Sequence, residues 1–302
     1  MDTATATAAH VKGPIVWLNM DQQELDDAYD QVVYAPNRDQ LGKRRLAASA
    51  AALTRIGKPE RFAYGPTPIE GLDVYRTSKA NAPAAIFVHG GAWRNGAAPE
   101  FTYLAEPFIH LGAHFVVLDF INVDQAGGSL FPMVEQVRRA VGWVYRNAEK
   151  FGGDRSRLHL VSHSSGSHLA GCTVTHDWAK DGLPLDILKG ATLSSGMYDL
   201  KPVRLSKRSK YVKFTDEMEQ ELSAMRHLDR LHTPLVLSYG TYETPEFQRQ
   251  TRDFAAAVKA AGKPVELLVG EGYNHFEMLE TLANPFGLLG RAVLGQMKLS
   301  QV

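Results

Sequence analysis

The feature that most constrains the fold is an alternation of short apolar runs with longer helical patterns, which begins at about Arg61. The runs typical of β-strands lie at 71–77, 84–91, 114–120, 157–163, 190–196, 234–240 and 264–270. Such alternation is typical of a mostly parallel sheet that is covered by helices on both faces. The sequence therefore predicts an α/β fold, in which reactive groups gather at the carboxyl ends of the strands.

Two of the helical patterns between these runs have recognisable limits. The first begins at about residue 131, carries valines on one face, and is expected to stop at Gly152. The second begins with Thr244 as its cap and Pro245 in its first turn, and it ends before Gly262 and Pro264. Both helices are long enough to cover a face of the sheet.

The chain before residue 61 has a different texture. Residues 1–12 are small and polar and predict a mobile tail, and the stretch from Asp21 to about Ile56 is helical in pattern. We expect two parts, a tail with a helical extension over 1–60 and a catalytic domain over 61–302. The extension either flanks the sheet or shapes an active site, and the pattern leaves both open.

Charge and cysteine content narrow the function classes. The 33 basic and 33 acidic side chains cancel, which gives no electrostatic reason to expect a nucleic acid or an anionic membrane as a partner. Cys172 is the only cysteine, so an intrachain disulfide and a zinc site built from cysteines are excluded. With no apolar run of membrane-spanning length, we expect a cytoplasmic protein that acts on a small molecule.

The stretch LHLVSHSSGSHLAG, residues 158–171, places Ser164 between a predicted strand and a predicted helix. A serine on such a turn, with glycine two residues to either side, is the nucleophile elbow of α/β hydrolases. Gly166 fulfils the downstream position, and Ser162 replaces the upstream glycine. Taken alone, this variant motif is equally typical of an ordinary turn. The amide of Ser165 lies where an elbow supplies one oxyanion donor.

A second motif, FVHGGAW, ends an earlier predicted strand. Glycines after a strand let backbone amides approach a ligand closely, and a His-Gly-Gly loop completes the oxyanion hole of such hydrolases. We expect Gly90 and Gly91 to supply these amides, with Ala92 open as an alternative. A plain glycine turn is the other interpretation.

A nucleophilic serine needs a base, and the base needs an orienting carboxylate, in the chain order Ser, Asp or Glu, His. Glu243 follows the strand predicted at 234–240, and His275 follows the last predicted strand. Asp199 is a credible rival for the acid. Glu246 lies inside a predicted helix, and Glu271 lies in the same loop as the base. The order favours a Ser164–Glu243–His275 triad.

Two further features carry alternatives. His163 and His168 could suggest a metal, but no metal-ligand spacing accompanies them, so a packing role is favoured. The segment from Lys201 to Phe214 holds six basic residues. It is interpreted as solvated surface, with a flap that attracts a carboxylate-bearing substrate as the functional alternative.

Together, HGGAW, HSSGSHLAG, SSGMYDL, ETPEFQRQ and GYNHFEML resemble the α/β-hydrolase family that includes arylformamidases (kynurenine formamidases) and related bacterial carboxylesterases. The resemblance runs from about Phe62 to Leu289. It implies an α/β-hydrolase fold, an oxyanion loop at 89–93, a nucleophile at Ser164 and a base at His275. The family's acid is usually an aspartate, and here Glu243 occupies that place.

These observations predict a serine hydrolase that cleaves a small ester or an aryl formamide through an acyl-enzyme. No metal or organic cofactor is expected, and the partner is the small-molecule substrate, with no nucleic acid and no membrane. A homodimer is left open. The alternatives are a short-acyl carboxylesterase without formamidase activity and a hydrolase-fold receptor that has lost catalysis.

Overall fold

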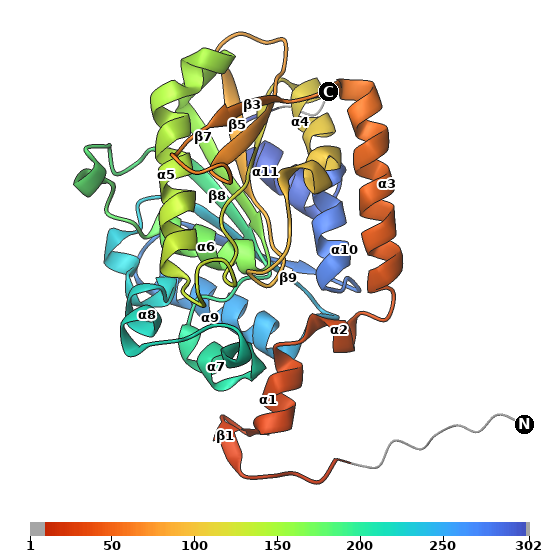
Figure 1. Cartoon of the computed structure of the whole chain (residues 1–302), viewed down its shortest axis with the longest axis vertical. Helices are drawn as coiled ribbons and strands as arrows, with labels where there is room; N and C mark the ends of the chain where they lie inside the picture. The colour runs from red at the N-terminus through yellow and green to blue at the C-terminus, as the bar shows by residue number, and fades with distance from the viewer. Residues whose placement is uncertain (1–9, 300–302) are drawn as a thin grey trace, which may run out of the picture.

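A computed structural model describes residues 10–299 of the chain. Its large sheet holds eight strands. They are β3 (Glu60–Ala63), β4 (Gly71–Tyr75), β5 (Ala82–Val88), β6 (His114–Leu118), β7 (Gly153–His163), β8 (Leu188–Ser194), β9 (Leu235–Gly240) and β10 (Val265–Gly270). A small hairpin of β1 (Ile15–Trp17) and β2 (Met20–Asp21) lies apart from the sheet (Figure 1). All the strands expected from the sequence are confirmed.

The strand order is β10-β9-β8-β7-β5-β6-β4-β3. From β10 to β6 neighbouring strands are parallel, whereas β4 runs antiparallel to β6 and β3 antiparallel to β4. β3 was not predicted, because its sequence ERFA is short, polar and mostly exposed at the sheet edge. The mostly parallel sheet confirms the predicted α/β fold.

Helices cover both faces of this sheet (Figure 1). They are α1 (Gln22–Ala28), α2 (Gln31–Tyr34), α3 (Arg38–Ile56), α4 (Ala105–Leu111), α5 (Phe131–Asn147), α6 (Ser165–Val174), α7 (Leu200–Leu205), α8 (Asp216–Glu221), α9 (Pro245–Ala260), α10 (His275–Glu280) and α11 (Leu288–Gln296). Short 3₁₀ segments include η1 (Ala98–Leu104), η2 (Ala148–Phe151) and η4 (Lys207–Lys210).

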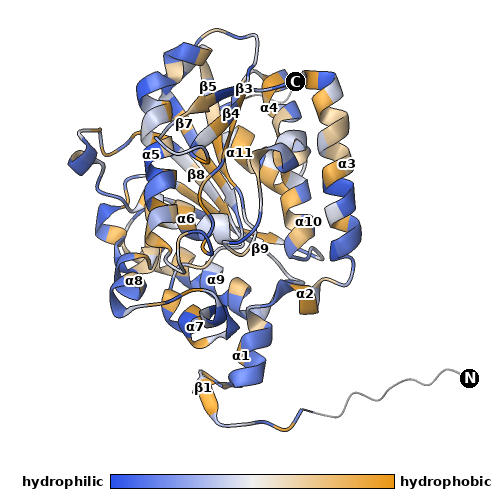
Figure 2. Cartoon of the chain, viewed as in Figure 1, coloured by the Kyte–Doolittle hydropathy of each residue, from blue (hydrophilic) through white to orange (hydrophobic). Residues whose placement is uncertain are grey.

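Successive side chains of a strand point to opposite faces of the sheet, and this alternation produces a hydrophobic cluster on each face. On β5, Ile86 and Val88 belong to a hydrophobic cluster shared with α5, α6 and α9, whereas Ala85 and Phe87 belong to a second cluster shared with α4, α10 and α11. Figure 2 shows hydrophobic residues on the strands between the helices and hydrophilic residues along much of α1 and α5. The sheet is thus buried on both faces, which leaves its carboxyl edge for the site.

The predicted helix limits are confirmed in detail. The Thr244 hydroxyl accepts a hydrogen bond from the Phe247 amide at 3.4 Å, and Pro245 is the first residue of α9. The valine-bearing helix α5 ends at Asn147 and continues as the 3₁₀ turn η2, which Gly152 closes in the left-handed region at φ 81°.

The N-terminal extension is helical as expected, but it is broken into α1, α2 and α3. Pro36 accounts for the second break, because a proline disfavours the helical conformation at the preceding residue, here Ala35 with φ −129° and ψ 78°. α3 packs along η1, where the Ser49 hydroxyl donates to the Glu100 carbonyl at 2.8 Å. Residues 1–9 of the predicted tail lie outside the described part of the chain, and the domain boundary at residue 60 stays a prediction.

Across residues 10–299, no helix combines the length and the apolar character needed to cross a bilayer.

Candidate active site

Ser164 occupies the tight turn between β7 and α6. Its backbone is in an unusual conformation, φ 60° and ψ −130°, which directs the side chain away from both elements. The turn depends on Gly166, because a Cβ atom there would lie 2.2 Å from the carbonyl oxygen of Val88. The sequence therefore folds here as a nucleophile elbow.

Ser162, the departure from the usual glycine, is accommodated by a neighbouring serine. The Ser167 hydroxyl donates to the Ser194 carbonyl at 2.7 Å and lies 2.9 Å from the Ser162 hydroxyl, so Ser162 donates to Ser167. Both side chains are buried, and each hydroxyl has a partner. The polar side chain that replaces glycine is thus satisfied inside the turn.

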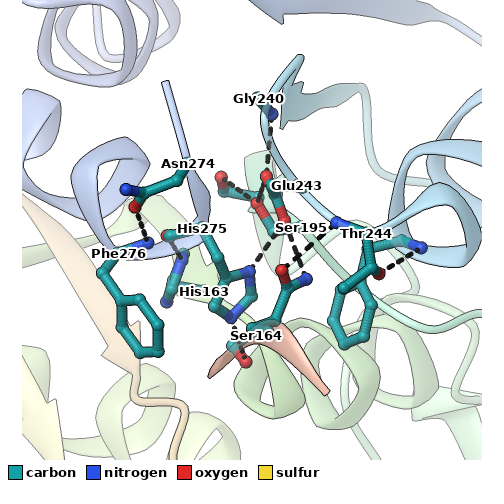
Figure 3. A network of polar contacts seen from close by, with 12 residues as sticks. His163, Ser164, Ser195, Gly240, Glu243, Thr244, Asn274, His275 and Phe276 are labelled. Atoms are coloured by element: carbon teal, nitrogen blue, oxygen red, sulfur yellow. Dashed lines mark hydrogen bonds and ion pairs between the residues drawn. The ribbon is translucent and has the colours of Figure 1, made fainter. Parts of the chain in front are cut away.

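The three side chains of the predicted triad meet at the carboxyl edge of the sheet (Figure 3). The Ser164 Oγ lies 2.8 Å from Nε2 of His275, and Nδ1 of His275 lies 2.7 Å from Oε2 of Glu243. Ser164 follows β7, Glu243 follows β9, and His275 follows β10. All three are buried, with Ser164 the most accessible at 8% exposure. This row can relay a proton from hydroxyl to imidazole.

Glu243 is held by several donors besides the imidazole. Its Oε1 accepts from the Gly240 amide at 2.7 Å and from the Ser195 hydroxyl at 2.6 Å, and its Oε2 accepts from the Gln31 amide group at 3.3 Å. These bonds hold the carboxylate in place against Nδ1 of His275, and an acceptor there fixes the Nδ1–H tautomer of the imidazole. Sequence reasoning missed Ser195 and Gln31. Ser195 follows β8 in a motif that carried the resemblance, whereas no pattern singles out Gln31.

The rival acids have other partners. The Asp199 carboxylate caps α7 through the Lys201 amide at 3.1 Å and pairs with Arg226 at 3.3 Å. Glu246 accepts a hydrogen bond from the Tyr29 hydroxyl at 2.9 Å, and Glu271 is exposed. None of these carboxylates is hydrogen-bonded to His275 in the described part of the chain, and Glu243 is.

His275 is fixed by the start of α10. Asn274 caps this helix, and its side-chain oxygen accepts from the Phe276 amide at 3.0 Å (Figure 3). His275 is therefore the first residue of the helix, and its backbone is fixed between the capping residue and the first turn. The Asn274 amide group also donates to Asn37, which precedes α3, at 2.8 Å. The extension thus contacts the element that carries the base.

The predicted oxyanion donors surround Ser164. Gly90 lies so close that a Cβ atom there would come within 2.7 Å of the Ser164 Cβ, and Gly91 adopts φ 125°, which favours glycine. Ser165 is the first residue of α6, so its amide has no partner within the helix. Ala92 belongs to the same turn, with φ 55°. The arrangement can place backbone amides on a developing oxyanion beside the Ser164 hydroxyl.

The two histidines of the elbow have structural partners. His163 donates from Nε2 to the backbone carbonyl of His275 at 2.8 Å, and burial together with the neighbouring His275 holds the pKa of His163 well below its usual value. His168 donates from Nε2 to the Leu222 carbonyl at 2.9 Å, and burial lowers its pKa to about 4. Both are neutral donors at pH 7. Among residues 10–299, no group of three or more metal-ligating side chains occurs.

Ser164 and His275 open into a cavity of about 760 Å³. We define its floor as the carboxyl ends of the strands with Gly90, Gly91, Ser164 and His275, and its roof as residues 29–45 together with Lys207, Arg208 and Tyr211. The roof includes the arginines 45 and 208. The open question about the extension is therefore answered, because it lines the cavity as well as flanking the sheet.

The fold and this site define an α/β hydrolase of the serine type. Residues 72–193 match the BD-FAE family. The chain is 28% identical to kynurenine formamidase of Danio rerio over 92% of this chain and 97% of that protein. It is 25% identical to isoprenylcysteine alpha-carbonyl methylesterase of Arabidopsis thaliana, over 71% of this chain and 56% of that one.

Among solved structures, the esterase of Pyrobaculum calidifontis superposes with a TM-score of 0.67 at 19% identity, covering 88% of this chain and 94% of the esterase, which supports the fold. These matches support the resemblance to the α/β-hydrolase family that includes the kynurenine formamidases and related carboxylesterases. It is an enzyme, a serine hydrolase.

Proposed function

We propose that the protein hydrolyses aryl formamides, and small aryl esters beside them, with Ser164 as nucleophile, His275 as base and Glu243 as orienting acid. The observation that carries this proposal is the row of contacts at 2.8 Å and 2.7 Å that links the three side chains at the floor of the cavity. The row supplies what a serine nucleophile needs, a base within hydrogen-bond reach and a carboxylate behind it.

In the first half of the reaction, the Ser164 oxygen attacks the substrate carbonyl carbon while its proton passes to Nε2 of His275. The resulting oxyanion is bound by the amides of Gly91 and Ser165, with Gly90 adjoining. When the tetrahedral intermediate collapses, the carbon–nitrogen or carbon–oxygen bond breaks, and His275 returns the proton to the leaving amine or alcohol. An acyl ester on Ser164 remains, which for a formamide is a formyl ester.

In the second half, a water molecule gives its proton to His275 and attacks the acyl carbon. Collapse of the second intermediate breaks the bond to the Ser164 oxygen, which regains its proton from His275. The products are a carboxylic acid, formic acid for a formamide, and the free enzyme. Glu243 stays ionised throughout and stabilises the imidazolium that forms in each half.

The formamide is placed first because the match to a kynurenine formamidase extends over nearly the whole length of both chains. A short-acyl carboxylesterase is the second candidate, and the match to a methylesterase over 71% of this chain favours it. Both share the acyl-enzyme chemistry. They differ in the bond that is broken and in what the roof accepts as leaving group.

Kinetics on N-formylkynurenine and p-nitrophenyl acetate separate the two candidates. A formamidase has the higher kcat/KM on N-formylkynurenine, and a general esterase turns over only the ester. Labelling with a fluorophosphonate reagent at Ser164, read by mass spectrometry, separates both from a receptor that has lost catalysis. An unlabelled Ser164 in folded protein contradicts the proposed nucleophile.

A cytoplasmic location is part of the proposal. It rests on the single cysteine, which a reducing compartment leaves as a thiol. Cys172 is buried, and burial raises the pKa of its thiol to about 12, so it is poorly reactive. Subcellular fractionation of the native source tests the location.

A further inference from the structure

One arginine of the roof is buried without a direct ion-pair partner among residues 10–299. The segment from Lys201 to Phe214 carries six basic residues, and Arg208 is the buried one among them, with 7% exposure. Its side chain lines the same cavity as Ser164. The segment thus exposes Lys201, Lys210 and Lys213 to solvent and lines the cavity around Arg208.

The guanidinium of Arg208 uses only part of its donors. Nη1 donates to the Tyr211 hydroxyl at 2.8 Å, and Nη2 donates to the Tyr29 carbonyl at 3.1 Å. Both acceptors are neutral. Nε is buried and has no acceptor among the described residues. Since a guanidinium has five N–H donors, most remain without an acceptor.

The charge of Arg208 also lacks an ion-pair partner in residues 10–299. The carboxylate of Asp30 is paired directly with Lys207, and the charge of Arg208 acts on it only without contact, helping to lower the pKa of Asp30. Arg45, a half-buried arginine of the roof, shows the contrast, because its guanidinium is paired with Glu100 at 2.8 Å. Burying a cation here without a paired carboxylate costs free energy, unless a ligand supplies the carboxylate.

Two aromatic rings place this charge beside the reacting groups. The guanidinium carbon of Arg208 lies 5.3 Å from the ring centre of Trp93, in the oxyanion loop, and 5.9 Å from that of Phe247. The Phe247 ring in turn meets the His275 ring edge-on at 5.2 Å. Cation–π contacts offset part of the cost of burial, and they hold the guanidinium in one orientation.

We propose that Arg208 is a specificity-determining residue that binds a carboxylate on the substrate, so that the enzyme prefers anionic aryl esters and aryl formamides to neutral ones. Free N–H groups on Nη1 and Nη2 are suited to a carboxylate, which a planar guanidinium binds with strong, charge-assisted hydrogen bonds. In a formamide the acyl group is only a formyl, so the carboxylate belongs to the leaving group. This inference rests on the proposed function.

A pair of substrates that differ in charge tests the proposal. In 4-acetoxybenzoate and 4-acetoxybenzamide the scissile ester is the same and the remote group is a carboxylate or a carboxamide. We expect Arg208→Gln to lower kcat/KM for the benzoate by about 10- to 100-fold, mainly through KM, and to change that for the benzamide by less than about threefold. Arg208→Lys keeps part of the preference, because it keeps the charge.

Lys210→Gln is the matched control. Lys210 belongs to the same 3₁₀ segment, is exposed, and loses the same unit of charge. Its variant should retain wild-type kinetics on both substrates. Equal losses on both substrates in Arg208→Gln, or the same shift in Lys210→Gln, overturn the proposal, since they indicate a structural role or a general effect of charge.

Wild-type protein provides an independent readout if the glutamine variant fails to fold. Benzoate should bind at a concentration at least about tenfold lower than benzamide, as measured by calorimetry. Equal binding overturns the carboxylate site. If the wild type hydrolyses neither aryl acetate nor formamide, the proposed function fails, and the benzoate and benzamide comparison still decides on Arg208.

Discussion

The floor and the roof of the cavity are held by different kinds of contact. The floor is made of strand ends and tight turns, whose buried groups are joined by short hydrogen bonds between neutral donors and the Glu243 carboxylate. The roof is made of helices and a 3₁₀ segment joined through long charged side chains, such as Arg44 with Glu280 and Lys207 with Asp30. Most of these roof side chains are partly exposed.

This difference separates chemistry from selection. The floor is closely packed, since a Cβ atom added at Gly90 would clash with Ser164, and catalysis needs a well-defined geometry. Surface ion pairs contribute only about 0 to 1 kcal/mol each, so the roof can vary in sequence at little cost. We therefore expect floor substitutions to abolish turnover and roof substitutions to change its rate or its substrate.

Ser164→Ala should have the largest effect. Without the nucleophile, kcat on an aryl acetate falls by about 10⁴-fold or more, whereas the thermal unfolding midpoint hardly changes, because alanine keeps the Cβ atom of the elbow. Ser156→Ala, an exposed serine near the other end of β7, is the matched control and should behave as wild type. Turnover by the Ser164 variant that persists through repeated purification would remove this serine from the mechanism.

Glu243→Gln tests the next position of the floor. A glutamine keeps the shape but cannot hold the Nδ1–H tautomer of His275 as a carboxylate does, so kcat should fall by about 10²- to 10⁴-fold. Glu243→Asp is the informative partner, since it keeps the charge and shortens the side chain by one methylene. We expect the aspartate variant to be the more active of the two. The reverse ranking in steady-state kinetics would mean that charge is not what Glu243 supplies.

The floor could be predicted from the sequence because local rules determine it. Strands such as β5 and β9 are mostly apolar runs, and their order along the chain assigns Ser164, Glu243 and His275 to the ends of β7, β9 and β10. The edge strand β3 was not predicted, because its sequence ERFA has few apolar side chains to bury. The break of the extension at Pro36 had a signal in the sequence, which a helical composition obscured.

The roof could not be predicted in this way. Gln31 reaches Glu243 across more than two hundred residues of sequence, and Arg208 is buried where it contacts Tyr29 and Trp93. Such contacts depend on how separate elements pack, and neither residue lies in a pattern of its own. The basic segment was expected to be solvated, and this holds for Lys201, Lys210 and Lys213, whereas Arg204 and Lys207 are half-buried and Arg208 is buried.

Gln31→Leu tests the contact that joins the roof to the floor. The variant loses a donor to Glu243 at 3.3 Å and an acceptor for the Thr244 amide at 3.3 Å. A hydrogen bond as long as 3.3 Å is expected to contribute about 1 kcal/mol, so kcat should fall by about three- to tenfold with KM nearly unchanged. Gln23→Leu, on the exposed face of α1, should have wild-type kinetics. A loss as large as that of Glu243→Gln would erase the distinction between floor and roof.

His168→Gln should have the smallest effect on activity. It tests instead how the stability of the protein depends on pH. Burial lowers its folded pKa to about 4, below the usual value of 6.5, so the unfolded chain binds the proton more readily. Its contribution to stability is therefore complete above pH 6.5 and is lost as the pH falls towards 4. In this window one such histidine changes the free energy of unfolding by about 1.4 kcal/mol per pH unit.

Urea titrations at several pH values give the free energy of unfolding as a function of pH. Its slope against pH should be shallower for His168→Gln than for wild type, because the variant takes up one proton fewer on unfolding. His110→Gln, at an exposed histidine of α4, should keep the wild-type slope. An unchanged slope in His168→Gln would mean that the acid sensitivity of the protein lies in the ion pairs of the roof and not in the neutral groups beneath the elbow.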